Sequence, residues 1–134
     1  MKKSEAEKEK KYKIIIVDDD EYLVNMYATK FSLNNAMVES CKSGDALLEK
    51  LRGGATADLI LLDIIMPGSS GLEVLGKMWE EKLCQNIPVV MLTNQSDEKD
   101  ISRAQKFGVA GYIVKAAATP SEVVSEVIKI IESK

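Results

Sequence analysis

Residues 14–21 read IIIVDDDE, a run of four apolar residues that passes directly into four consecutive acids. The β-branched side chains of the apolar run are typical of a buried strand. Two carboxylates about 4 Å apart repel each other by roughly 4 kcal/mol at an effective dielectric constant of 20. The acids at the end of this predicted strand therefore either point into water or surround a positive charge.

The composition indicates one soluble globular domain. The chain has 134 residues, of which 46% are hydrophobic and 29% charged, and this length is sufficient to bury a core. The net charge of −3 gives no general attraction to nucleic acid or to a membrane surface. No apolar run is long enough to cross a bilayer, and the N-terminus has no apolar signal segment. We expect a cytoplasmic protein with a charged lead-in at 1–12 and one domain at 13–134.

Cysteine and histidine usage narrows the possible chemistry. Cys41 and Cys84 are far apart and form no CxxC pair, so we interpret them as buried free thiols rather than a disulfide or a metal site. The chain contains no histidine. This absence excludes nucleophile systems that depend on histidine and metal sites with histidine ligands.

The hydrophobic pattern alternates between short strands and longer helices. Capping-box spacing between Ser70 and Glu73, and between Thr119 and Glu122, marks two helix starts. Near-continuous apolar strands separated by helices predict a doubly wound α/β domain, with a parallel sheet that is covered on both faces. The predicted strands are 13–17, 36–40, 59–62, 88–92 and 112–114, and the predicted helices are 21–33, 45–51, 71–82, 98–107 and 120–131.

Polar residues follow the predicted strands without a spacer. Asp18, Asp19 and Asp20 follow the first strand and Asp63 the third, while Thr93 and Lys115 follow the last two; in a parallel sheet all of them meet at one edge. Clustered carboxylates suit Mg²⁺, and an aspartate bound to the metal can attack a phosphoryl group. The ammonium and the hydroxyl would neutralise the phosphoryl oxygens. No glycine-rich loop has nucleotide-binding spacing, so the phosphoryl donor would be another molecule.

Each of these residues also has an ordinary structural interpretation. Acids at a helix start are favoured by the helix dipole. Asp63 could begin a turn, Thr93 could cap a helix, and Lys115 could be a surface charge. The joint placement of these residues at the strand ends of one predicted sheet favours a site over four separate explanations.

Four motifs together resemble the receiver domain of bacterial two-component response regulators. They are IIIVDDDE (14–21), LILLDIIMPGSSGLEVL (59–75), VVMLTNQ (89–95) and GYIVK (111–115). The resemblance covers about residues 13–131 and implies a five-stranded (βα)5 fold with the flavodoxin-like strand order 2-1-3-4-5. It also implies that the chain accepts a phosphoryl group in a Mg²⁺-dependent reaction.

The resemblance implies a role for each matching residue. Asp63 would accept the phosphoryl group, and Asp18 and Asp19 would hold Mg²⁺ together with Asp63 and the backbone carbonyl of Ile65. Asp20 lies outside this acidic pair and is expected to begin the first helix.

The same resemblance implies a conformational switch. Thr93 would be the switch hydroxyl and Tyr112 the switch aromatic residue, while Lys115 would contact the phosphoryl oxygens. Pro67 and Gly71 match the turn that follows the phosphoacceptor strand.

Two departures from the family pattern carry expectations of their own. Ala116 stands where the family usually has a proline, often after a cis bond. Because a cis bond before a residue other than proline costs about 3–4 kcal/mol, we predict a trans bond and a shifted loop at 116–119. Ile65 offers no polar group to align an attacking water, so with Gln95 nearby we hypothesise slow loss of the phosphoryl group.

The expected function is that of a stand-alone receiver that takes its phosphoryl group from a histidine kinase or a phosphotransfer protein. Its output would be contact with a downstream protein, without direct binding to nucleic acid or membrane, and a homodimer is possible. It would be no enzyme beyond assisting its own phosphotransfer and autodephosphorylation. One alternative is a degenerate receiver that acts only as a binding module. Another is a small aspartyl-phosphate hydrolase, because Asp18 and Asp20 form a D-x-D pair, although the Gly-Thr that follows in that family is missing.

Overall fold

The computed structural model describes residues 11–83 and 85–133, which form a five-stranded parallel sheet in the order β2-β1-β3-β4-β5. This topology confirms the predicted fold class and strand order. The strands are β1 (Tyr12–Val17), β2 (Ala36–Cys41), β3 (Leu59–Leu62), β4 (Val89–Thr93) and β5 (Gly111–Val114). The helices are α2 (Glu21–Ser32), α3 (Gly44–Arg52), α4 (Gly71–Glu80), α5 (Glu98–Lys106), the 3₁₀-helix η1 (Lys115–Ala117) and α6 (Pro120–Glu132).

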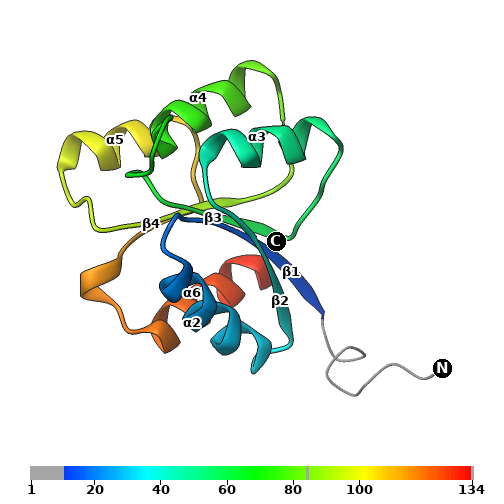
Figure 1. The fold of residues 1–134 in the computed structure, drawn as a ribbon. Helices are drawn as coiled ribbons and strands as arrows, with labels where there is room; N and C mark the ends of the chain where they lie inside the picture. The colour runs from blue at the N-terminus through cyan, green and yellow to red at the C-terminus, as the bar shows by residue number, and fades with distance from the viewer. Residues whose placement is uncertain (1–10, 84, 134) are drawn as a thin grey trace.

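The helices form a layer on each face of the sheet, with α2 and α6 on one face and α3, α4 and α5 on the other (Figure 1). Successive residues of a strand point to opposite faces. Ile14 and Ile16 therefore pack with α2 and α6, whereas Ile15 and Val17 pack with the other three helices. This alternation explains why the buried stretches 14–17, 59–62 and 89–92 are apolar at every position: both of their faces are core.

The element boundaries differ from the predicted ones by at most two residues. The largest difference is at the end of α4, which was predicted to reach Lys82 and ends at Glu80. Lys82 has a φ of 55°, in the left-handed region, which a continuing α-helix does not allow. Among the described residues, no helix is both long enough and apolar enough to cross a membrane.

Side-chain caps fix the predicted helix starts. Ser70 accepts a hydrogen bond from the Glu73 backbone N–H at 3.2 Å, and Glu73 accepts one from the Ser70 N–H at 3.1 Å. Thr119 and Glu122 form the same reciprocal pair at the start of α6. Asp20 accepts a hydrogen bond from Leu23 N–H at 3.1 Å and caps α2, as predicted.

Several smaller expectations can be compared with the structure. Cys41 is a buried free thiol, as predicted, whereas Cys84 lies outside the described residues, as do residues 1–10 of the predicted lead-in. The bond between Lys115 and Ala116 is trans, and the chain enters η1 there. The apolar residues of α6 are buried at Val123, Val124, Val127 and Ile131 and half-buried at Ile128 and Ile130.

Candidate functional site

The parallel register brings the ends of four strands to one edge of the sheet. Val17 pairs with Leu62, so Asp18 and Asp63 leave neighbouring strands at the same level. Thr93 pairs with Val114, so Lys115 follows on the adjacent strand β5. The sequence-predicted site residues at these strand ends therefore come together, as expected from the carboxyl edge of a doubly wound sheet.

Three acids lie close enough together to hold a metal ion. Asp18, Asp19 and Asp63 each present a carboxylate oxygen, and these oxygens lie within 4.8 Å of one another. Asp18 and Asp63 are buried, with exposed fractions of 4% and 6%, while Asp19 is exposed. Oxygen ligands with one side open to water suit Mg²⁺, which usually retains several water ligands. The donor set thus fits the predicted ion.

Lys115 bridges the two buried acids. Its Nζ lies 2.7 Å from Asp18 Oδ2 and 3.1 Å from Asp63 Oδ2, and its side chain is 14% exposed. Burial alone would lower the pKa of Lys115, but the hydrogen bond to Asp18 and the charge of Asp63 outweigh burial and raise this pKa. Lys115 is therefore a firmly protonated cation at the centre of the site.

The cluster of Asp18, Asp19 and Asp63 carries more negative charge than Lys115 alone neutralises. Three carboxylates against one ammonium leave a net charge of −2, which matches a divalent cation. Burial raises the pKa of Asp18 by more than the hydrogen bonds from Lys115 and the Asp20 backbone lower it. The site as it stands thus disfavours the charged form of Asp18, and a further cation would relieve this cost.

Backbone N–H groups orient both buried carboxylates. Asp18 Oδ1 accepts a hydrogen bond from Asp20 N–H at 3.0 Å, and Asp63 Oδ1 accepts one from Ile64 N–H at 2.7 Å. In each acid the other oxygen, Oδ2, contacts Lys115. The side chain of Ile65 is 59% exposed. The role of its carbonyl as a metal ligand stays a prediction.

The predicted switch residues share a partner, Gln95. Thr93 is fully buried, and its Oγ1 accepts a hydrogen bond from Gln95 N–H at 3.3 Å. The Tyr112 hydroxyl donates to the Gln95 carbonyl oxygen at 2.6 Å, and burial raises the pKa of this half-buried tyrosine. The backbone of Gln95 therefore links the hydroxyl at the end of β4 to the aromatic residue on β5.

One side chain at this edge was missed by the sequence reasoning. Asn94 Oδ1 accepts a hydrogen bond from the Ala116 backbone N–H at 3.0 Å. The sequence offers one indication of this bond: a residue other than proline after Lys115 has a backbone N–H group that can donate to a side chain.

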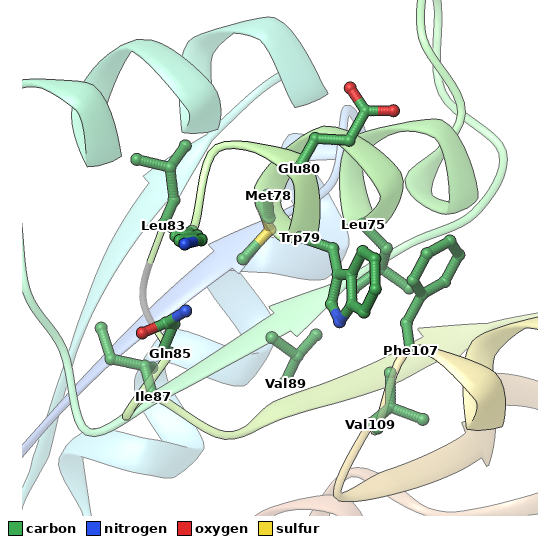
Figure 2. A pocket seen from close by; sticks show the side chains of 12 residues that line it. Leu75, Met78, Trp79, Glu80, Leu83, Gln85, Ile87, Val89, Phe107 and Val109 are labelled. Carbon is green, nitrogen blue, oxygen red and sulfur yellow. The ribbon is translucent and has the colours of Figure 1, made fainter.

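A second feature that the sequence did not indicate is a cavity of about 550 Å³ at the opposite edge of the sheet. Its wall includes Val89 at the start of β4, Val109 just before β5, and Trp79 near the end of α4 (Figure 2). Trp79 is 69% exposed. The cavity is formed by residues that are distant in sequence, so no local pattern indicates it.

Comparisons with known proteins identify a family for the whole domain. The family model for the response regulator receiver domain matches residues 14–128. The transcriptional regulatory protein ResD of Bacillus subtilis (strain 168) is 34% identical over 115 residues, which are 86% of this chain and 46% of ResD. The phosphate regulon transcriptional regulatory protein PhoB of Escherichia coli (strain K12) is 30% identical over 115 residues, or 86% of this chain and 49% of PhoB. The chain thus spans about half the length of these relatives.

A solved structure agrees on the fold. The CheY-like response regulator receiver domain protein from Methanospirillum hungatei JF-1 has a TM-score of 0.81 and 21% sequence identity, and the match covers 90% of this chain and 94% of that chain.

Proposed function

Because this chain belongs to the family of response regulator receiver domains, whose general function is to accept a phosphoryl group, we propose that Asp63 accepts it here in a Mg²⁺-dependent reaction. The observation that carries the proposal is the arrangement around Asp63. Its buried carboxylate shares a metal-binding group with Asp18 and Asp19 and lies 3.1 Å from the Lys115 ammonium. A nucleophile, a metal site and a fixed cation are the parts that phosphoryl transfer requires.

The chemistry assigns a distinct task to each oxygen of Asp63. Oδ1 accepts the backbone N–H of Ile64 at 2.7 Å, whereas the partner of Oδ2 is the Lys115 ammonium at 3.1 Å, a side chain that can move aside. We therefore assign Oδ2 as the oxygen that attacks phosphorus. The new Oδ2–P bond forms as the bond from phosphorus to the donor breaks, and the donor keeps the electron pair of that bond. Bound Mg²⁺ would neutralise the charge on the phosphoryl oxygens. The Lys115 ammonium moves from the carboxylate to one of these oxygens.

The proposed switch uses the residues that meet at Gln95. The Thr93 hydroxyl oxygen accepts a hydrogen bond from Gln95 N–H, and a phosphoryl group on Asp63 would offer the hydroxyl proton a charged acceptor, so the hydroxyl would turn toward it. Breaking the bond from Gln95 N–H to Thr93 would loosen the loop that also holds the Tyr112 hydroxyl. Phosphorylation would thereby alter the surface formed by α5, β5 and α6.

The proposed partners follow from the chemistry of the chain. Receiver domains take their phosphoryl group from histidine kinases, so the proposed donor is a histidine kinase or a phosphotransfer protein. The altered surface passes the signal to a downstream protein or to a second copy of the chain. The reduced thiol of Cys41 suits the cytoplasm, where the proposal places this protein.

The test is incubation with Mg²⁺ and acetyl phosphate, followed by measurement of the intact mass. We expect one added phosphoryl group in the wild-type protein and none in Asp63→Asn or without Mg²⁺. Asp20→Asn is the matched control, because it also removes an acid from this edge while asparagine still caps α2. This control should gain the same mass as the wild type.

The alternatives give different results. A receiver that serves only as a binding module would gain no mass, and it would not bind beryllofluoride in the presence of Mg²⁺. An aspartyl-phosphate hydrolase would release phosphate from an aryl phosphate through many turnovers. The observed carboxylates and Lys115 favour a phosphoacceptor over a binding module.

A further inference from the structure

The hydrogen bond between Asn94 and Ala116 joins the ends of β4 and β5 beyond their last backbone pair. That last pair is Thr93 with Val114. Asn94 follows Thr93, and its Oδ1 accepts the Ala116 N–H at 3.0 Å. The side-chain amide thus extends the pairing of the two strands past the end of the sheet. The bonded residues Asn94 and Ala116 directly follow the site residues Thr93 and Lys115.

This bond depends on the residue that departs from the family pattern. A proline at position 116 would have a fixed φ and no N–H group. Ala116 has an N–H group and a freer backbone, and the bond to its neighbour Lys115 is trans. The hydrogen bond from Asn94 restrains the chain at the position where a proline ring would otherwise do so.

We propose that Asn94 is a positioning residue that holds Lys115 over Asp18 and Asp63 by binding the backbone of Ala116. Lys115 is the first residue of η1, and Ala116 is the second, so an anchor at Ala116 limits how far the lysine backbone moves. With its backbone restrained, the ammonium remains at 2.7 Å and 3.1 Å from the two carboxylates. The inference rests on the proposed function, in which Lys115 contacts the transferred phosphoryl group.

The size of the effect follows from the exposure of the bond. Asn94 and Ala116 are both exposed, so water competes for the donor and the acceptor. Loss of the bond should therefore lower the rate of phosphorylation by about three- to tenfold and leave the fold intact. A larger loss is expected from Lys115→Ala, which removes the ammonium itself.

The experiment is a double-mutant cycle on the rate of phosphorylation by acetyl phosphate at saturating Mg²⁺. The variants are Asn94→Ala, which removes the acceptor, Ala116→Pro, which removes the donor, and the double variant. Ser96→Ala is the control, because it lies in the same exposed loop. Varying the acetyl phosphate concentration separates the maximal rate constant from the half-saturating concentration.

Positioning predicts a specific pattern of results. Asn94→Ala should lower the maximal rate constant about three- to tenfold, with little change in the half-saturating concentration. The same substitution should have no further effect when Pro replaces Ala116 or when Ala replaces Lys115. Ser96→Ala should behave as the wild type.

Other results overturn the inference. An unchanged maximal rate in Asn94→Ala, or an equal loss with and without proline at 116, would show that Asn94 does not act through the Ala116 N–H. In both cases the wild type is still phosphorylated, so the proposed function stands. A wild-type protein that gains no phosphoryl group overturns the proposed function and this inference together.

Discussion

Gly71 begins α4 directly behind the loop that follows Asp63, and a β-carbon on this glycine would overlap the carbonyl oxygen of Asp63. The obstacle is backbone, which cannot turn aside as a flexible side chain can. We expect Gly71→Ala to lower the free energy of unfolding by about 1–3 kcal/mol. To make room for the β-carbon, the backbone at Asp63 would have to move, and this displacement would slow the phosphorylation of Asp63. Urea denaturation measures the first effect and intact mass over time the second.

Gly76 provides the matched control within the same helix. A β-carbon there would meet only the ring of Phe107 at 3.7 Å, an ordinary contact. Because glycine inside a helix costs roughly 0.5–1 kcal/mol relative to alanine, Gly76→Ala should stabilise the protein. Equal effects of the two substitutions would contradict the role assigned to Gly71.

Glu39 on the edge strand β2 contributes stability that depends on pH. The hydrogen bond from Lys50 and the ion pair with Lys13 lower the pKa of Glu39, with Nζ to carboxylate distances of 2.6 Å and 2.9 Å respectively. A carboxyl group whose pKa is lowered by folding stabilises the protein above its unfolded pKa of about 4.3, and this contribution is lost as the pH falls through the folded pKa.

The corresponding variant is Glu39→Gln. Its unfolding free energy should be lower than that of the wild type at neutral pH by less than about 1 kcal/mol, because these side chains are about one-third exposed and screened by solvent. The difference should shrink to zero at a pH well below 4. Urea denaturation at several pH values measures it, and a difference that grows on acidification would contradict the assignment.

At the scale of the element, the capping box of α6 is a separable source of stability. The Thr119 hydroxyl oxygen accepts a hydrogen bond from the Glu122 backbone N–H at 3.1 Å, and this bond is lost in Thr119→Ala. We expect a loss of about 1 kcal/mol in the free energy of unfolding. Ser121→Ala, which changes an exposed residue in the same helical turn, should have a much smaller effect. Thermal and urea denaturation of both variants would compare them.

The elements themselves were largely predictable because their signals are local. Capping residues such as Ser70 and Thr119 mark helix starts, and the buried stretches 14–17, 59–62 and 89–92 are apolar throughout. Helix ends were less accurate: α4 ends at Glu80, and two residues later Lys82 adopts a left-handed conformation that no nearby residue type requires. The close approach of Gly44 to Val74 depends on how α3 and α4 pack, so sequence patterns do not reveal it.

At the scale of the whole molecule, metal binding should be linked to stability. The formal net charge of −2 among Asp18, Asp19, Asp63 and Lys115 would be relieved by a divalent cation, and a cation that binds only the folded state would stabilise it. At a Mg²⁺ concentration ten times the Kd, linkage contributes about 1.4 kcal/mol, which raises the Tm by a few degrees. Differential scanning fluorimetry with and without MgCl₂ measures this shift.

Asp19→Asn separates metal binding from general salt effects. Asp19 is exposed, so its replacement should leave the fold intact while greatly weakening the response to Mg²⁺. NaCl at matched ionic strength controls for charge screening. An equal rise in Tm with NaCl, or an undiminished response in Asp19→Asn, would contradict the proposed metal site.

The site was predictable from the sequence to the extent that it follows from topology. Parallel strands bring Asp18, Asp63 and Lys115 to one edge whatever their loops do. The hydrogen bond from Ala116 to Asn94 was not predictable in this way, because it depends on how two loops meet. The cavity beside Trp79 likewise exists only after α4, β4 and the segment 107–109 that follows α5 have come together.

The fluorescence of Trp79 can be used to follow the position of α4. It is the only tryptophan of the chain, and it lies eight residues after Gly71, roughly 12 Å along the axis of α4 at 1.5 Å per residue. The indole is exposed at the far edge of the sheet, away from the acidic group. A change in its fluorescence on phosphorylation would therefore record a displacement of α4 or of the cavity wall, and not contact with the metal ion.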